Sequence, residues 1–235
     1  MNIKSLKSDL QKLTSSEKVL IYQRFFKTGP GEYGEGDVFL GITMPNIRKM
    51  VKKYYKDISI SQLNKLISSK FHEERMTALL ILVEKYQKGN QQEKKEIYDY
   101  YLNNTQYINN WDLVDLSSYK IIGEHLLDKD KEILYQLARS KDLWEKRIAI
   151  ISTMTFIRNN QFKDTLAISE VLLRDNHDLI HKAVGWLLRE VGKRDRGVEE
   201  IFLKKHYQSM PRTMLRYAIE KFPEDLRQKY LKGTI

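Results

Sequence analysis

The chain has 235 residues, with 41 Lys and Arg against 31 Asp and Glu, and so carries a formal net charge of +10 at pH 7. This length allows one domain or one continuous repeat array with a sizeable core. The charge favours an acidic partner, nucleic acid first and an anionic membrane second; a generically basic protein without such a partner is the alternative. The absence of Cys excludes disulfides, zinc ribbons and thiol catalysis.

The N-terminus lacks the apolar core of a signal peptide, and no window approaches the roughly 18 uncharged apolar residues of a membrane span. We therefore expect a soluble, cytoplasmic protein without a membrane partner. Charge is unevenly distributed: residues 1–110 carry a net +6, residues 111–173 a net −1 and residues 174–235 a net +5. Two basic ends around a near-neutral centre would suit a groove that grips a polyanion at both ends, and chance would produce the same pattern.

Taken in chain order, the predicted elements are all helices, because no run alternates as a strand would. Residues 14–17 (Thr-Ser-Ser-Glu) and 59–61 (Ser-Ile-Ser) are typical of helix starts. Two glycine-rich turns at 29–36, Gly89 at the end of an apolar helix, and Pro211 mark boundaries.

A weak repeat underlies these helices, in which mostly cationic residues recur at intervals of 34 to 36 and each opens an apolar helical segment. Two helices and their turns in about 35–45 residues is the spacing of HEAT-like repeats. We therefore predict an all-α superhelix of about six helix pairs forming one domain over residues 1–235. The repeat positions would line one side of a concave, basic groove. They are Arg75, Trp111, Arg147, Lys182 and Arg216.

Trp111 and Asp115 are the most informative pair. They lie four residues apart, so a predicted helix places both on one face, where an aromatic plate and a carboxylate suit a developing cation. Tyr119 projects onto the same face, as do Ile122 and Leu126. Asp112 is explained as compensation of the helix dipole after an Asn109 or Asn110 cap. A structural role for Asp115 is the alternative.

The segment from Lys182 to Lys193 predicts a helix with one apolar stripe. Trp186 falls roughly 130° from the centre of that stripe, on the arc shared with Lys182, Arg189 and Lys193. A Trp among three cations resembles a nucleic-acid contact surface, unless Trp186 packs on an adjoining repeat and the cations are solvated. The predicted core stripe comprises Ala183, Val184, Leu187, Leu188 and Val191.

Arg147 lies early in a helix opened by Asp142 and Glu145, and that helix is apolar nearly all round. An Arg in such a helix must either pair internally or face the groove, where its planar fork suits a phosphate. The five His residues show no metal-ligand spacing, and the Gly-Lys-Ser/Thr ending of a P-loop is missing. We expect no metal and no cofactor.

Several blocks, in order over about residues 30 to 195, resemble the AlkD-type DNA alkylation repair proteins, which are alkylpurine DNA glycosylases built from HEAT-like repeats. The segment after Met210 carries no matching motif. The blocks are Phe39-Leu40-Gly41-Ile42 with Pro45 and Arg48; His72-Glu73-Glu74-Arg75; Trp111-Asp112-Leu113-Val114-Asp115; Trp144 with Arg147; and Lys182-Ala183-Val184-Gly185-Trp186-Leu187-Leu188-Arg189-Glu190.

The resemblance implies hydrolysis of the N-glycosidic bond of cationic N7-alkylguanine or N3-alkyladenine in duplex DNA, without a base pocket. It implies that Asp115 is the catalytic carboxylate and that Trp111 and Trp186 cradle the sugar and backbone of the lesion. Arg147 would contact the DNA backbone. The family's aromatic residue near the N-terminal end of the groove is matched by Tyr33, with the register off by about one residue.

Two other functions compete with a glycosylase acting as a monomer on alkylated double-stranded DNA. The first is a non-catalytic DNA-binding or damage-sensing protein on the same scaffold. Only the side chains of Asp115, Trp111 and Arg147 would distinguish a glycosylase from such a protein. The second is a protein–protein scaffold, a frequent use of helical repeats. A scaffold would show no salt-sensitive affinity for DNA.

Overall fold

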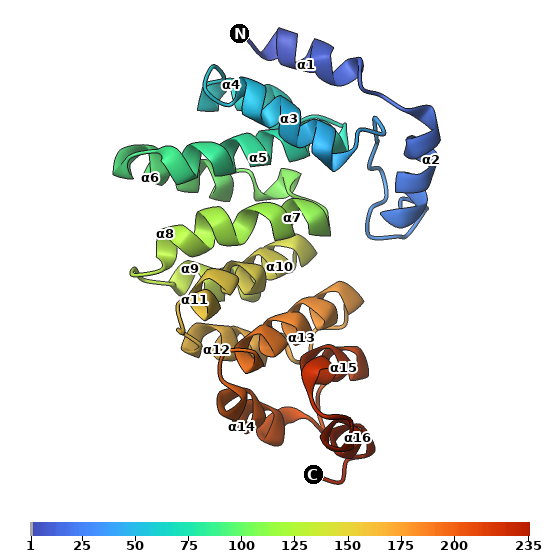
Figure 1. The fold of residues 1–235 in the computed structure, drawn as a ribbon, viewed down its shortest axis with the longest axis vertical. Coiled ribbons are helices and arrows are strands. Elements are labelled where there is room, and N and C mark those ends of the chain that lie inside the picture. Colours follow the sequence, from blue (N-terminus) through green and yellow to red (C-terminus); the bar gives the residue numbers. More distant parts are fainter. Residues whose placement is uncertain (1) are drawn as a thin grey trace. The chain divides into compact units, whose positions relative to one another are not determined.

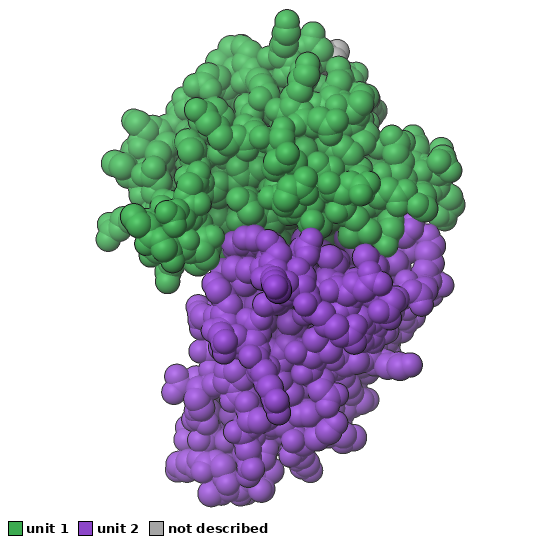
Figure 2. Space-filling model, turned by 180° about the vertical axis from the view of Figure 1, so that it is seen from behind, with its two compact units in different colours: residues 1–121 green, residues 122–235 purple. Residues whose placement is uncertain are grey.

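The computed structural model describes residues 2–235, and within them helices are joined by turns, with a single isolated bridge between Val38 and Phe71 in place of any strand (Figure 1). This confirms the predicted all-α fold of stacked helices. The chain forms two compact units, unit 1 (residues 1–121) and unit 2 (residues 122–235), coloured separately in Figure 2. A single domain and a concave groove along the whole chain stay predictions. Across residues 2–235 no helix is long and apolar enough to cross a membrane.

Unit 1 is organised around α5, which packs against α3, α4, α6 and α7, while α1 packs on α3 and α4. In Figure 1, α2 lies beside this stack and is joined to α3 by a long loop. No residue of α2 is buried, and its side chains Leu20, Ile21 and Phe25 are exposed. The helices of unit 1 are α1 (Ile3–Gln11), α2 (Ser16–Phe25), α3 (Met44–Tyr54), α4 (Ile60–Ile67), α5 (His72–Lys88), α6 (Gln91–Leu102), the 3-10 turn η1 (Thr105–Tyr107) and α7 (Trp111–Ser118).

The predicted helix starts of unit 1 are confirmed. Ser15 caps α2, and Ser59 forms a reciprocal capping box with Gln62 at the start of α4. Gly89 is the C-cap of α5 but is extended (φ −77°, ψ 158°) rather than left-handed. A Cβ on Gly89 would lie 2.9 Å from the Lys85 carbonyl oxygen, so close approach and not a positive φ favours glycine here.

Unit 2 is organised around α13, which packs against α10, α12, α14 and α15. The predicted core stripe of this helix is confirmed, because all five of its residues are fully buried. Gly185 lets α13 and α15 approach closely, since a Cβ there would lie 2.4 Å from the Met214 carbonyl oxygen. The helices of unit 2 are α8 (Glu124–Leu126), α9 (Glu132–Ala138), α10 (Leu143–Ser152), α11 (Met154–Arg158), α12 (Lys163–Leu172), α13 (Asp178–Gly192), α14 (Arg196–His206), α15 (Arg212–Ala218), η3 (Ile219–Lys221) and α16 (Glu224–Lys232).

The structure refines the predicted repeat. Arg147, Lys182 and Arg216 are each the fifth residue of a helix, in α10, α13 and α15. In α7 Trp111 is the first residue and the fifth is Asp115, so a carboxylate occupies the position that is cationic in those three helices. Arg75 and Arg147 are buried, at 4% and 5% exposure, and for Arg147 this agrees with the internal pairing that the sequence left open.

Candidate functional site

Helix α7 presents Trp111 and Asp115 together, as the sequence predicts. Asn110 caps the helix and its side-chain oxygen accepts a hydrogen bond of 2.8 Å from the Trp111 amide. Trp111 and Asp115 are half-buried, whereas Leu113 and Val114, on the opposite side, are fully buried. The exposed face of α7 therefore carries the aromatic ring and the carboxylate one turn apart.

Beyond Ser118 the helix geometry differs from the one assumed in the projection. Residues Tyr119–Gly123 form a π-helix, which has more residues per turn than an α-helix. Ile122 and Leu126 are buried, at 0% and 4% exposure, while Tyr119 is half-buried. The shared face of Tyr119, Ile122 and Leu126 with Asp115 stays a prediction.

Trp111 lies against two aromatic residues that sequence reasoning missed. Its ring stacks on Phe26, with centroids 5.5 Å apart and planes at 27°, and meets Phe25 edge-on at 5.8 Å. Phe26 is buried, whereas Phe25 is 60% exposed. The only available signal was two adjacent Phe residues at the end of a helix, which does not indicate a partner. The stack fixes one face of the indole against the protein.

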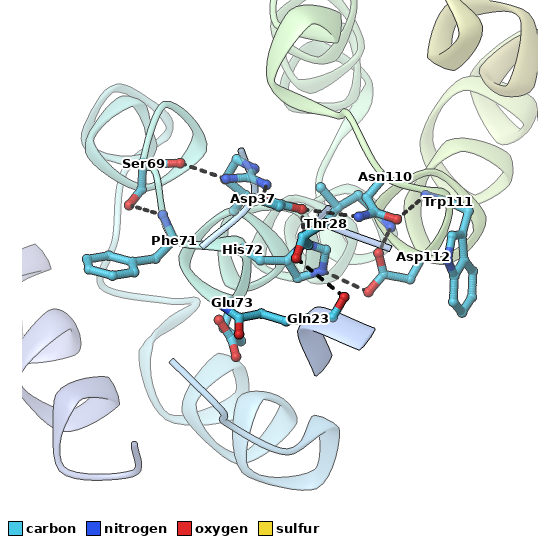
Figure 3. Close-up of polar contacts among 12 residues, drawn as sticks. Gln23, Thr28, Asp37, Ser69, Phe71, His72, Glu73, Asn110, Trp111 and Asp112 are labelled. Carbon is cyan, nitrogen blue, oxygen red and sulfur yellow. Dashed lines mark hydrogen bonds and ion pairs between the residues drawn. The ribbon is translucent and has the colours of Figure 1, made fainter. Parts of the chain in front are cut away.

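Behind Trp111 lies a buried cluster of charged side chains, shown in Figure 3. His72, the first residue of α5, lies between two carboxylates: Nδ1 is 2.9 Å from Asp37 Oδ2 and Nε2 is 2.9 Å from Asp112 Oδ2. Asp37 is also bound by Arg75 Nη2 and, at 3.1 Å, by Asn110 Nδ2. We call these five residues the His72 cluster. Because Asp112 also binds His72, it does more than compensate the helix dipole.

The electrostatics of the His72 cluster favour ion pairs over neutral groups. Burial disfavours the imidazolium, but Asp112 and Asp37 outweigh it and raise the pKa of His72 to about 9. Burial likewise opposes ionisation of Asp37, yet the hydrogen bonds and charges of His72 and Arg75 hold the pKa of Asp37 below its ordinary value. The cluster is thus charged at neutral pH.

Glu73, next to His72, fixes the loop that carries the Phe-Leu-Gly-Ile block. Its carboxylate accepts hydrogen bonds from the amides of Leu40, Gly41 and Ile42, at 2.8, 2.8 and 3.1 Å. Gly41 has a φ of +77°, and a Cβ there would lie 2.1 Å from the Ser15 carbonyl oxygen. The block is therefore explained by a backbone turn bound to a buried carboxylate.

The carboxylate of Asp115 also acts electrostatically on a buried group in the interior of unit 1. Burial, together with the negative charge of Asp115, raises the pKa of the Tyr101 phenol, although a hydrogen bond to Ser117 opposes this. The Tyr101 hydroxyl lies 2.9 Å from Ser117 Oγ, and Ser117 Oγ donates to the Leu113 carbonyl at 2.5 Å. A buried polar chain therefore supports the middle of α7 below the carboxylate.

Tyr33 lies in the glycine-rich stretch, half-buried, and its hydroxyl donates to the Phe25 carbonyl oxygen at 3.5 Å. The contact is long for a hydrogen bond. Phe25 and Phe26 each place a ring against Trp111.

In unit 2 the predicted face of α13 exists, and every predicted cation on it is paired. Glu190 accepts a hydrogen bond from Trp186 Nε1 at 3.2 Å and from Lys193 Nζ at 2.6 Å. Arg189 Nη1 binds Glu220, and Arg189 Nε lies 3.8 Å from Glu190. The Lys182 ammonium lies 2.6 Å from Asp178. Carboxylates thus neutralise the cations, a feature the sequence reasoning left out.

Arg147 is buried in unit 2 and holds two helices together. Its Nη1 donates to the Leu179 carbonyl oxygen, in the first turn of α13, at 2.6 Å. Asp142 caps its helix by accepting from the amides of Trp144 and Glu145, as predicted. Within residues 2–235 no group of three or more His, Asp and Glu side chains is arranged to hold a metal ion.

Comparison with known proteins places the chain in a family. Residues 6–222 match the model of the DNA alkylation repair enzyme family, so the chain belongs to that family. A solved structure described as a predicted DNA alkylation repair enzyme from Enterococcus faecalis is similar, with a TM-score of 0.69 and 17% sequence identity. The match covers 90% of this chain and 97% of that one, and it supports the fold. No curated protein matches the sequence.

Proposed function

We propose that the protein is a DNA glycosylase that releases cationic alkylpurines, N7-alkylguanine and N3-alkyladenine, from duplex DNA. The observation that carries this proposal is the pairing of Trp111 and Asp115 on the exposed face of α7, in a chain of the DNA alkylation repair enzyme family. The protein would act as a monomer and without a cofactor.

Cleavage of the N-glycosidic bond requires few protein groups besides a carboxylate held in position. An alkylated purine is already cationic, so the C1′–N bond can break with its electron pair moving to the base, which leaves neutral. Positive charge then develops on the sugar as an oxocarbenium-like ion. Asp115 stabilises that ion and orients the water whose oxygen bonds to C1′ and whose proton is released. The indole of Trp111 adds cation–π attraction of about 0.5–2 kcal/mol where water is excluded.

The remaining predicted residues would bind DNA. Trp186 would pack against the sugar and backbone beside the lesion, and the cations of α13, Lys182, Arg189 and Lys193, would meet phosphates after leaving their carboxylate partners. Arg147, only 5% exposed, would contact the backbone from a fixed position rather than as a mobile side chain. Tyr33 would also contact the DNA.

The cavity near α7 in unit 1 does not resemble a base pocket. It measures about 130 Å³ and is lined mostly by aromatic and aliphatic side chains, including Phe25, Phe26 and Phe39. Its three charged lining residues are already bonded: His72 to two carboxylates, Asp112 to His72, and Glu73 to three backbone amides. Recognition of an extruded base needs free hydrogen-bonding groups at its edge. This supports excision without base flipping, and we expect bulky adducts to be released as well as methyl adducts.

Release of N7-methylguanine from methylated duplex DNA tests the proposal, with Asp115→Asn compared with wild type at low and moderate salt. We expect the variant to bind DNA normally and to lose activity by a factor on the order of 10²–10³. Asp99→Asn, which removes a carboxylate that pairs with Lys95 on the exposed side of α6, is the matched control and should retain activity.

The outcomes separate the competing functions. Equal release by wild type and Asp115→Asn would remove Asp115 from the mechanism. Salt-sensitive DNA binding without release by wild type would establish a non-catalytic DNA-binding protein instead. Neither release nor binding would leave a protein–protein scaffold.

A further inference from the structure

We propose that His72 is a positioning residue for the site on α7: its ring joins Asp37, on the loop that follows α2, to Asp112 in the first turn of the helix that carries Trp111 and Asp115. This inference rests on the proposed function for its effect on excision. The placement of α7 by His72 can be tested independently of any activity.

The two hydrogen bonds define the state of the ring. Both ring nitrogens of His72 lie 2.9 Å from a carboxylate oxygen, and the side chain is 3% exposed. A carboxylate accepts hydrogen bonds and does not donate them, and a neutral imidazole has a single N–H. Only the imidazolium satisfies both partners at once. The link between the loop and α7 therefore depends on a protonated ring.

Ring stacking reinforces the same connection. The His72 ring stacks on Phe39, with centroids 4.7 Å apart, and lies 5.0 Å from Phe26 at a tilt of 37°. Phe26 in turn stacks on Trp111 at 5.5 Å. A cationic ring is attracted to the aromatic faces beside it. Hydrogen bonds and aromatic contacts thus connect His72 to both of the first two residues of α7.

The surrounding charges show which bond would fail if His72 lost its charge. Asp37 would keep Arg75 and Asn110 as partners. Asp112 accepts one other hydrogen bond, from the Leu113 amide at 2.8 Å, and its side chain is 12% exposed. Asp112 would therefore turn toward water and release the first turn of α7.

The other charged groups around His72 have partners of their own. On α5, Glu73 accepts from three loop amides, and Glu74 forms a 2.7 Å ion pair with Lys7 of α1. On α2, burial and the charge of Glu73 raise the pKa of Tyr22, so that phenol is neutral. Among residues 2–235 no second cation lies within ion-pair distance of Asp112, so His72 is the residue that ties this carboxylate to α5.

The test compares wild type with His72→Gln, whose amide can donate to one carboxylate only. Hydrogen exchange of the individual amides of Leu113 and Val114, measured by NMR at pH 7, reports the first turn of α7. We expect exchange there to become about tenfold faster or more, because one charge-assisted hydrogen bond is lost. Excision should show a lower kcat with a smaller change in KM, because the phosphate contacts proposed for α13 are untouched.

Two further variants keep the test specific. Tyr54→Phe removes the hydroxyl of Tyr54, on α3, that donates a 2.8 Å hydrogen bond to Asp9. This variant is the matched control for general destabilisation. The double variant His72→Gln with Asp112→Asn restores a neutral hydrogen-bonding pair, so its α7 exchange should be slower than that of His72→Gln alone. Ring ¹⁵N signals of wild type at pH 8 should show both nitrogens protonated.

The result that supports the proposal is faster exchange confined to α7, recovered in the double variant. Unchanged α7 exchange in His72→Gln overturns it, as does a change spread equally over the helices of unit 1, as for Tyr54→Phe. A neutral ring at pH 8 also overturns it. If α7 exchange changes as expected but wild type releases no base, the proposed function fails and the positioning of α7 by His72 stands.

Discussion

The His72 cluster of unit 1 and the α13 face of unit 2 both pair cations with carboxylates, yet they do so in opposite environments. His72, Arg75 and Asp37 are at most 8% exposed and are bonded through several atoms each. Lys182 of α13 and Lys193, the C-cap of that helix, are 41% and 44% exposed, and each is paired with a carboxylate of α13. Buried pairs of this kind cannot exchange partners without leaving a charge unsolvated, whereas exposed pairs can.

The buried ion pairs of unit 1 and the exposed ion pairs of α13 therefore serve different purposes. In unit 1 ionic hydrogen bonds fix the position of α7 and the neighbouring loop, and they are not available to DNA. On α13 the pairs contribute little to stability, and in the proposed function a phosphate would replace each carboxylate.

Glu73→Gln should produce the largest loss of stability. The carboxylate accepts three backbone amides while 2% exposed, and a side-chain amide would bring an N–H toward N–H donors. We expect a loss on the order of 4 kcal/mol in the free energy of unfolding, measured by urea denaturation. The neighbouring Glu74→Gln, which weakens only the ion pair with Lys7, should cost about 1 kcal/mol. Equal losses from the two variants would contradict a fixed role for the buried contacts.

The pH dependence of stability should reveal His72. Because its pKa rises from 6.5 to about 9 on folding, the stabilisation it supplies is complete below pH 6.5 and is lost as pH rises through 9. The corresponding free energy is on the order of 3 kcal/mol. Urea unfolding from pH 6 to pH 10 should therefore show wild type losing more stability than His72→Gln. Parallel curves for the two proteins would show that His72 is not charged in the folded state.

Local patterns in the sequence were sufficient for the helices and for the exposed pair on α7. The core stripe of α13 from Ala183 to Val191, the cap at Ser59 and the shared face of Trp111 and Asp115 all follow from helical periodicity and capping chemistry, which act over a few residues. The resemblance located the same blocks and the same family.

The supports of the site could not be predicted because their partners are distant in sequence. His72 is 35 residues from Asp37 and 40 from Asp112, and no local pattern encodes such pairings. The burial of Arg75, and the choice between an internal partner and the groove for Arg147, could not be predicted because spacing alone does not show whether a guanidinium turns inward. The π-helix after Ser118 was missed for a similar reason: its extra residue per turn has no signal in the periodicity.

Unit 2 contains one buried carboxyl that lacks the partners found in the His72 cluster. Glu199 is 2% exposed, its Oε1 has no hydrogen-bond partner, and burial raises its pKa to about 8, with Arg196 opposing. A raised carboxyl pKa means that stability is lost as pH rises from 4.5 through 8. Glu199→Gln should therefore stabilise the protein, by on the order of 2 kcal/mol at pH 8, with no gain at pH 4.

Thermal or urea unfolding at the two pH values measures the effect of Glu199→Gln. Glu200→Gln, which removes the neighbouring carboxylate paired with Arg196 at 2.8 Å, is the control and should change stability by less than about 1 kcal/mol. A loss of stability for Glu199→Gln at pH 8 would mean that the charged form of Glu199 is satisfied in the folded protein.

The smallest expected effect concerns DNA affinity. Glu190→Gln retains an acceptor for the Trp186 Nε1 hydrogen bond and removes the charge that neutralises Lys193 and lies near Arg189. We expect duplex DNA to bind about threefold more tightly at 50 mM salt, with a steeper salt dependence, because more cations are free to meet phosphates. Glu84→Gln, which breaks the i,i+4 pair with Lys88 on α5, should leave affinity unchanged if binding is specific to α13. An equal gain in affinity from both variants would mean that DNA affinity depends on net charge alone. The contrast between the buried and the exposed ion pairs would then have no bearing on DNA binding.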